Sequence, residues 1–240
     1  MMTALEDRKP VTEHIDDLRG CIIRVVISVF TCALVSLLFS NALLTLFTEP
    51  ARAAFGKLHF FAPADAFIVK LQVSIISGLI IASPYVILQI WTYIAPGLYK
   101  HERQMLLPWI ALSAFLFLVG ATFAFKLVLP LALSFLMGFQ TNFMEPVISI
   151  THYMSFLSSM ITAFGIAFNM PIFILACVAL NLVQVETLSK FRRHAYVASF
   201  ILAMALTPPD MISQVLLALP LIVLYELSIL GSRFIKKRKK

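Results

Sequence analysis

The stretch LQVSIISGLIIASPYVILQIWTYIAPGLY, residues 71–99, decides the fold of this chain. It runs for 29 residues without a charged side chain and contains two prolines, Pro84 in its interior and Pro96 near its end. About 20 apolar residues in a helix are enough to cross the hydrocarbon core of a bilayer. The stretch therefore predicts a membrane-spanning helix, which we place at residues 67–94 because Pro96 and Gly97 stop a helix.

The composition of the whole chain extends this prediction. Of the 240 residues, 60% are hydrophobic and 13% are charged, whereas a soluble domain carries about 25% charge. A backbone in lipid must satisfy its own hydrogen bonds, which helices do within one segment. A transmembrane barrel would need alternating segments of about 10 residues, and the sequence has none. The chain is predicted to be an all-α integral membrane protein, a single polytopic domain over residues 1–240.

Charged residues divide the sequence into six predicted spans, of which the last two are short. The spans are residues 22–44, 67–94, 104–137, 154–182, 195–206 and 212–230. A loop containing Glu49, Pro50 and Arg52 is expected after the first span. The third would be about 51 Å long as one helix, so it either projects from a core of about 30 Å or kinks at Pro130. The short final pair either thins the bilayer or forms a hairpin that does not fully cross.

The basic residues predict the orientation. Fifteen of the nineteen lie in the N-terminal tail, the loops near residues 100 and 190, and the C-terminal tail. Cytoplasmic loops carry the excess of Lys and Arg, so both termini are predicted to be cytoplasmic. Six bases fall in the last eight residues, after an apolar segment. This pattern favours contact with anionic lipid and not with nucleic acid.

No feature of the sequence predicts an enzyme or a cofactor site. Motifs such as HExxH, GxSxG and the P-loop lysine motif are absent. The three cysteines have no paired spacing, so we expect neither a disulfide framework nor a metal site. We therefore expect a non-catalytic protein without a bound cofactor.

Two short polar stretches border the predicted spans on the cytoplasmic side. They are PVTEHIDDLR, residues 10–19, and YIAPGLYKHER, residues 93–103. Each could simply be a solvated helix end. However, carboxylates beside an anionic lipid surface suit a cationic partner, because guanidinium and carboxylate groups pair in two-pronged geometry.

Four polar residues fall within or at the edge of the predicted spans: Gln72, Asn169, Gln214 and Glu226. Such groups usually bond to neighbouring helices or mark a function. We expect Gln72 to pack between helices and Glu226 to lie at the interface. Asn169 could satisfy the carbonyl of Ala167, which Pro171 leaves free, or it could face a groove. A groove at that position would suit a small-solute or ion transporter, which is the alternative function.

Several motifs together bring a known family into view. They are IAPGLYKHER at 94–103, AFGIAFNMP at 163–171, LTPPD at 206–210 followed by Ser213 and Gln214, and HIDDLR at 14–19. With these motifs the chain resembles the TatC family, the polytopic core of the twin-arginine protein translocase. The resemblance covers nearly the whole chain.

The resemblance implies a receptor in the bacterial inner membrane. Such a receptor binds signal peptides with consecutive arginines and exports folded proteins with single-span TatA- and TatB-type partners, and we expect several copies of the chain in the complex. Carried over by position, Asp17 and Glu102 would meet the arginines. The residues expected to shape the same surface are Arg19, Tyr93, Lys100 and Arg103.

Further positions carry over to the outer loops and to the final hairpin. Pro50 would fall in the first outer loop and Asp210 in the last. Thr207 and Gln214 would help to seat a partner helix, and the short hairpin adds Met204 as a contact. The chain departs from the family pattern at Asp17 and Asn169, because the family has Glu at the first position and often has Glu at the second. An ionisable role at residue 169 cannot be filled in the same way by an amide.

Overall fold

The computed structural model describes residues 11–94, 106–138, 147–179, 183–206 and 211–238. Within these ranges the chain is helical and has no β-strand beyond one isolated bridge between His59 and Ser149. The elements are α1 (Val11–Leu38), α2 (Ser40–Phe55), α3 (Asp65–Ile94), α4 (Leu106–Phe123), a π-helical turn η3 (Ala124–Val128), α5 (Leu129–Met137), α6 (Ile150–Ala167), α7 (Met170–Ala179), α8 (Val185–Lys190), α9 (Arg192–Leu206) and α10 (Met211–Arg238).

Four helical stretches in the described part of the chain are long and apolar enough to cross a membrane. They are Ile15–Leu38, Asp65–Ile94, Leu107–Met137 and Ile150–Ala179. The prediction of an all-helical membrane protein is therefore confirmed.

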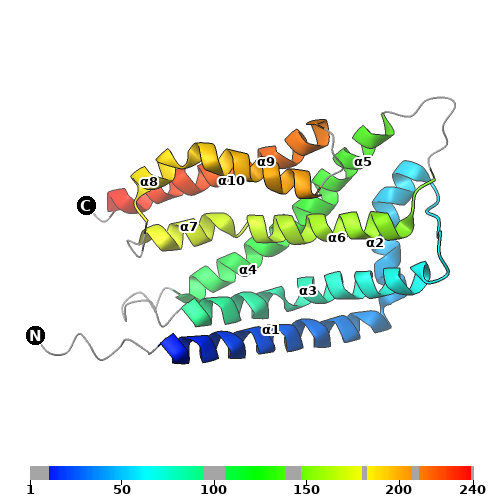
Figure 1. Ribbon diagram of the computed structural model, residues 1–240, viewed down its shortest axis with the longest axis horizontal. Coiled ribbons are helices and arrows are strands. Elements are labelled where there is room, and N and C mark those ends of the chain that lie inside the picture. The colour runs from blue at the N-terminus through cyan, green and yellow to red at the C-terminus, as the bar shows by residue number, and fades with distance from the viewer. Residues whose placement is uncertain (1–10, 95–105, 139–146, 180–182, 207–210, 239–240) are drawn as a thin grey trace, which may run out of the picture.

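The long helices run between two ends of the molecule (Figure 1). We call one the termini end: α1 begins there, α3 ends there, and α10 ends there. At the opposite end, which we call the α2 end, lie α2 and the starts of α3 and α6. In this view α4, η3 and α5 run obliquely across the other helices, and the hairpin of α9 and α10 stops short of the α2 end.

The largest core cluster includes α2, and this corrects one prediction. The expected loop is wrong for Glu49, Pro50 and Arg52, because the chain bends at Phe39 and continues as a helix through Phe55. Buried Phe47 and Ala51 face the core, and the Tyr153 hydroxyl donates to the Phe47 carbonyl at 2.7 Å. Glu49 and Arg52 are exposed on the other side of the helix. Glu49 and Arg52 therefore mark the exposed face of α2 and not the end of a helix.

The third predicted span bends through a π-helical turn. The turn Ala124–Val128 precedes α5, in which Pro130 occupies the first turn. The Leu129 amide donates to the Ala124 carbonyl, five residues back. Because proline has no amide proton and its ring crowds the preceding turn, the wider turn accommodates Pro130 without ending the helix. Lys126, within the turn, is exposed.

Pro171 has a different effect, because the fourth span breaks just before it. α6 ends at Ala167, α7 begins at Met170, and the Asn169 amide donates to the Ile166 carbonyl, only three residues back. In the final pair, α9 has 15 residues and α10 has 28. α10 continues as a helix beyond the predicted span of residues 212–230 and through its basic end.

Candidate functional site

The termini end is organised by the close packing of α1 along α3. A Cβ placed on Gly78 would lie 2.6 Å from the backbone nitrogen of Ala33, so only glycine permits this approach. Nearer the termini end, the Cys21 thiol contacts the Gln89 carbonyl at 3.5 Å. These two contacts define an antiparallel register. If it is continued by one turn, Asp17 on α1 lies opposite the last turn of α3, which contains Tyr93.

This register places Asp17 and Tyr93, two residues of the predicted arginine-binding surface, at the same end of the α1–α3 pair. Asp17 and Tyr93 are half-buried and Arg19 is exposed, and both Asp17 and Tyr93 interact with other residues. The predicted partners Lys100, Glu102 and Arg103 lie outside the described residues. The helix ends that flank their segment, the end of α3 and the start of α4, lie at the termini end (Figure 1).

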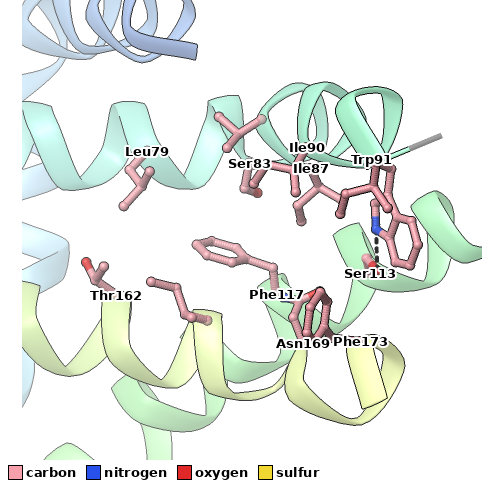
Figure 2. Close-up of a pocket in the computed structure, with 13 residues that line it drawn as sticks. Leu79, Ser83, Ile87, Ile90, Trp91, Ser113, Phe117, Thr162, Asn169 and Phe173 are labelled. Carbon is pink, nitrogen blue, oxygen red and sulfur yellow. Dashed lines mark hydrogen bonds between the residues drawn. The ribbon is translucent and has the colours of Figure 1, made fainter. Parts of the chain in front are cut away.

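A cavity of ≈ 280 Å³ begins beside this surface and extends into the apolar part of the protein. Its lining is mostly apolar and comes from α3 on one side and from α4, α6 and α7 on the other (Figure 2). Residue 94, at the end of α3, and Leu79, four turns earlier, mark its extent along that helix. Its wall also contains Trp91, whose indole NH donates to the Ser113 hydroxyl at 3.1 Å.

Asn169 lines this cavity at the break between α6 and α7. Its side-chain amide donates to the Gly165 carbonyl at 2.9 Å. The break deprives this carbonyl of its usual helical donor, because the backbone amide of residue 169 turns instead to Ile166. The two options raised by the sequence therefore occur together: Asn169 faces a cavity and satisfies a freed carbonyl, which is that of Gly165 and not that of Ala167.

The remaining predicted residues lie far from this cavity along the chain. Pro50 lies inside α2, half-buried, and not in a loop. Met204 is exposed on α9, and the half-buried Gln214 on α10 donates to the Phe200 carbonyl at 3.1 Å. Thr207 and Asp210 lie outside the described residues. Gln72 donates to the Ser155 hydroxyl at 3.0 Å, which joins α3 to α6 and confirms its predicted packing role.

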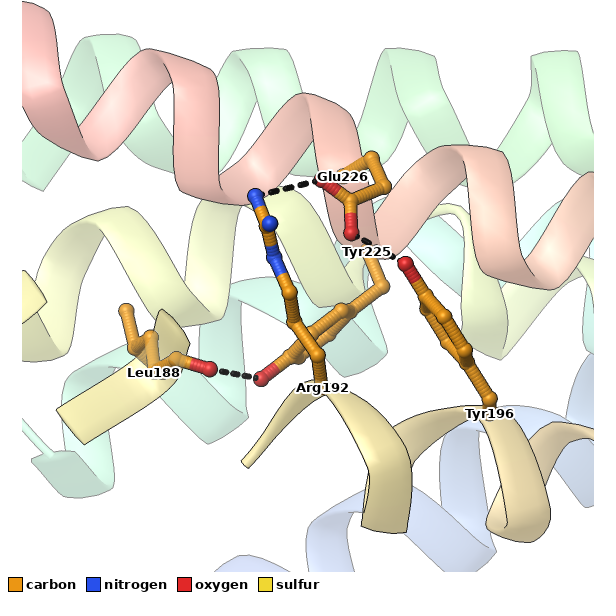
Figure 3. Close-up of polar contacts among 5 residues, drawn as sticks. All are labelled: Leu188, Arg192, Tyr196, Tyr225 and Glu226. Atoms are coloured by element: carbon orange, nitrogen blue, oxygen red, sulfur yellow. Dashed lines mark hydrogen bonds and ion pairs between the residues drawn. The ribbon is translucent and has the colours of Figure 1, made fainter. Parts of the chain in front are cut away.

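One polar cluster escaped the sequence interpretation. Glu226 on α10 accepts from Arg192 at 2.9 Å and from the Tyr196 hydroxyl at 2.5 Å, both on α9 (Figure 3). We call these three residues the Glu226 cluster. The sequence gave one usable signal: an acid and a base stand at neighbouring ends of two consecutive apolar segments. As isolated interfacial charges, Arg192 and Glu226 give no sign of their pairing.

These features define a class. The chain is a polytopic helical membrane protein with a largely apolar cavity that begins near the termini end of the bundle.

Comparison with known proteins identifies the family. The sequence pattern of the family described as Sec-independent protein translocase protein (TatC) matches residues 13–220. A TatC protein of Carboxydothermus hydrogenoformans is 40% identical over 238 residues, which cover 98% of each chain. The TatC protein of Escherichia coli K12 is 32% identical over 234 residues, which cover 96% of this chain and 91% of that one. The chain belongs to the TatC family.

A solved structure agrees with this assignment. A crystal structure described as the twin arginine translocase receptor TatC superposes with a TM-score of 0.86 at 33% identity, covering 93% of this chain and 99% of that chain. The relatives are named as components of a protein translocase, which is a transport role and not a catalytic one. Because the named cargo is protein, the alternative of a small-solute or ion transporter loses its support.

Proposed function

We propose that this protein is the receptor subunit of a twin-arginine translocase in the bacterial inner membrane. It binds twin-arginine signal peptides at the termini end, which faces the cytoplasm, and exports folded proteins with TatA- and TatB-type partners. The proposed binding surface comprises Asp17, Arg19, Tyr93, Lys100, Glu102 and Arg103. The similar TatC crystal structure carries the name of such a receptor.

The observation that carries this proposal is the antiparallel register of α1 and α3. Their contacts at Gly78 and Cys21 direct the turn of Asp17 towards the last turn of α3. The chain that leaves this turn contains Glu102 within eight residues of Ile94. Two adjacent guanidinium groups need two acceptors, and a carboxylate offers each arginine a bidentate partner. We therefore assign the binding of the two arginines to Asp17 and Glu102.

The same proposal assigns roles to the rest of the molecule. The chain crosses the membrane six times with both termini in the cytoplasm, and α9 with α10 forms the partner site that includes Met204, Thr207 and Gln214. Several copies assemble in the complex. Pro50 supports the α2 end, and Asp210 lies in the last outer turn.

Crosslinking to a signal peptide tests the binding surface. A photoreactive amino acid is placed at position 17, at position 102, or at Lys57 near the α2 end as a control, and the precursor carries either Arg-Arg or Lys-Lys. Positions 17 and 102 should crosslink to the Arg-Arg precursor far more than to the Lys-Lys precursor, and position 57 to neither. Equal crosslinking to both precursors would refute the assignment.

Thiol labelling tests the topology. Cys21, Cys32 and Cys177 are free, so they are first replaced by serine or alanine. Lys57→Cys should react with an impermeant thiol reagent added outside the cell, whereas Lys190→Cys should react only after the membrane is opened. Outside labelling at position 190 would overturn the proposed orientation.

A further inference from the structure

Glu226 joins two points on α9 with its two carboxylate oxygens. One oxygen accepts from the Arg192 guanidinium and the other from the Tyr196 hydroxyl. Arg192 and Tyr196 are four residues apart, so they lie on the same face of α9, one turn from each other. Two contacts along one face restrain both the rotation of α9 and its position along α10 more than either contact would alone.

The rest of α9 follows the rotation that this cluster sets. Ser199 and Ala203 continue the same helical face as Tyr196, and both are buried. The opposite face carries Val197, Ile201 and Met204, whose exposed fractions are 58%, 56% and 55%. A rotation of α9 would therefore exchange a packed face for an apolar face that is now turned outward.

The Glu226 cluster is only partly exposed to solvent, so its charged groups depend on one another for stabilisation. The side chains of Arg192 and Glu226 are 37% and 30% exposed, and the Nε atom of Arg192 is buried without a hydrogen-bond partner. Charged groups that are partly removed from water are costly unless they pair. Beside them the Tyr225 hydroxyl donates to the Leu188 carbonyl at 2.8 Å (Figure 3), which ties α8 to α10 as well.

We propose that Glu226 is a positioning residue that fixes the rotation of α9 and so presents the face of Val197, Ile201 and Met204 to a partner helix. The second half of this statement rests on the proposed function, since it assumes that the hairpin receives a partner. The first half concerns this chain alone.

The first half is tested by a distance measurement in the full-length protein in membranes. Spin labels are attached at exposed Val197 on α9 and exposed Val223 on α10. Glu226→Gln keeps an acceptor for Tyr196 but removes the charge that Arg192 needs. The Glu226→Gln variant should broaden the distance distribution. The fraction of molecules in which α9 has left its position on α10 should rise about 10-fold, which corresponds to the loss of one charge-assisted hydrogen bond. Glu49→Gln, which removes an exposed acid on α2, should leave the distribution narrow.

A charge exchange separates positioning from simple damage to the fold. Arg192→Glu combined with Glu226→Arg restores an ion pair with opposite polarity and should narrow the distribution again. An unchanged distribution in Glu226→Gln, or a double variant no narrower than the single ones, would overturn the proposal.

The second half is tested by crosslinking a single-span partner from position 204. Glu226→Gln should lower this crosslink and raise crosslinks from the neighbouring face of α9, and the charge exchange should reverse both changes. If α9 loosens while the partner crosslink stays constant, Glu226 does not present the docking face. If the unaltered protein gives no partner crosslink from position 204, the proposed partner site fails, while the distance measurement still decides the role of Glu226 within the hairpin.

Discussion

Two antiparallel helix pairs in this protein are joined by opposite means. α1 and α3 meet through close backbone contact, with Gly78 against Ala33. α9 and α10 meet through polar side chains: the Glu226 cluster near the start of α9 and Gln214 near its end. The first pair therefore depends on shape and the second on a few directed hydrogen bonds.

This difference matters for what each pair positions. The close packing at Gly78 does not depend on a side chain that can change partner, so the register that directs Asp17 towards the end of α3 is fixed once the helices fold. Interhelical hydrogen bonds in membranes are worth about 0.6 kcal/mol on average, and their acceptors can be exchanged for a partner's groups. The α1–α3 pair is thus suited to a fixed recognition surface, and the α9–α10 pair to a docking surface.

The largest effect is expected from breaking the first pair with Gly78→Val. The added Cβ would lie within 3 Å of three backbone and side-chain atoms of Ala33, and a backbone cannot move aside as a flexible side chain can. Overpacking a tight contact costs about 1–3 kcal/mol and occasionally more, and we expect the upper part of that range. Thermal stability in detergent measures the loss.

Gly20→Ala provides the matched control on α1. A Cβ at Gly20 would meet only the end of the Arg24 side chain at 3.9 Å, so stability should stay the same or rise slightly through helix propensity. If Gly78→Val is as stable as this control, close packing does not hold the pair together.

The next effect concerns what the first pair positions, and it uses two neighbouring acids. Asp17→Asn should weaken binding of an Arg-Arg precursor about 10-fold or more, because a charge-assisted hydrogen bond is worth about 1.5–3 kcal/mol. Asp16→Asn removes the same charge from an exposed position one residue away and should change little. Precursor affinity in detergent, with Arg-Arg and Lys-Lys signals, measures both.

Two further variants sharpen this result. Glu102→Gln should match Asp17→Asn, and Asp17→Glu should be mild since it restores the residue of the family pattern. In Asp17→Asn and in Glu102→Gln, the preference for the Arg-Arg precursor over the Lys-Lys precursor should nearly vanish. If these variants keep the preference for Arg-Arg, Asp17 and Glu102 do not read the arginines, and the surface around Tyr93 and Lys100 becomes the next candidate.

The sequence predicted the helical membrane fold because uncharged runs of span length have no other stable form in lipid. It failed at α2, where Glu49 and Arg52 appeared to end the helical region. Their helix continues because charged residues can occupy its exposed face while Phe47 and Ala51 enter the core. It also did not indicate that α10 extends past its predicted span to Arg238, since charge marks the edge of the membrane and not the edge of a helix.

The candidate site was predictable only where local chemistry sufficed. Asn169 was singled out because a polar residue beside Pro171 stands out in an apolar run, but the acceptor that it satisfies depends on where the helix breaks. The Glu226 cluster was missed because Arg192 and Glu226 are 34 residues apart. Their pairing follows from the angle and rotation of two helices, which one-dimensional spacing does not contain.

A smaller effect is expected at Asn169, which lies between the two pairs. Asn169→Leu removes the donor to the Gly165 carbonyl and should reduce export or stability by an amount near the intramembrane average of about 0.6 kcal/mol. Asn169→Glu should be tolerated if water reaches the cavity. Thr162→Val, a substitution of similar shape in the same lining, is the control. If Asn169→Leu exports at the rate of the unaltered protein, the hydrogen bond from Asn169 to Gly165 does not contribute to function.

The smallest effect is expected at Gln214, and it distinguishes a hydrogen bond within the α9–α10 pair from one to a partner. Its side-chain amide donates to the Phe200 carbonyl across the hairpin, whereas a contact with a partner could use its carbonyl oxygen as an acceptor. Gln214→Glu keeps acceptor oxygens but has no amide donor, and Gln214→Leu has neither. If the bond within the hairpin is what matters, both variants should lower partner crosslinking from Met204 equally and slightly, since a single such bond contributes about 0.6 kcal/mol. If only Gln214→Leu is impaired, Gln214 acts as an acceptor for the partner, and the Glu226 cluster alone orders the hairpin.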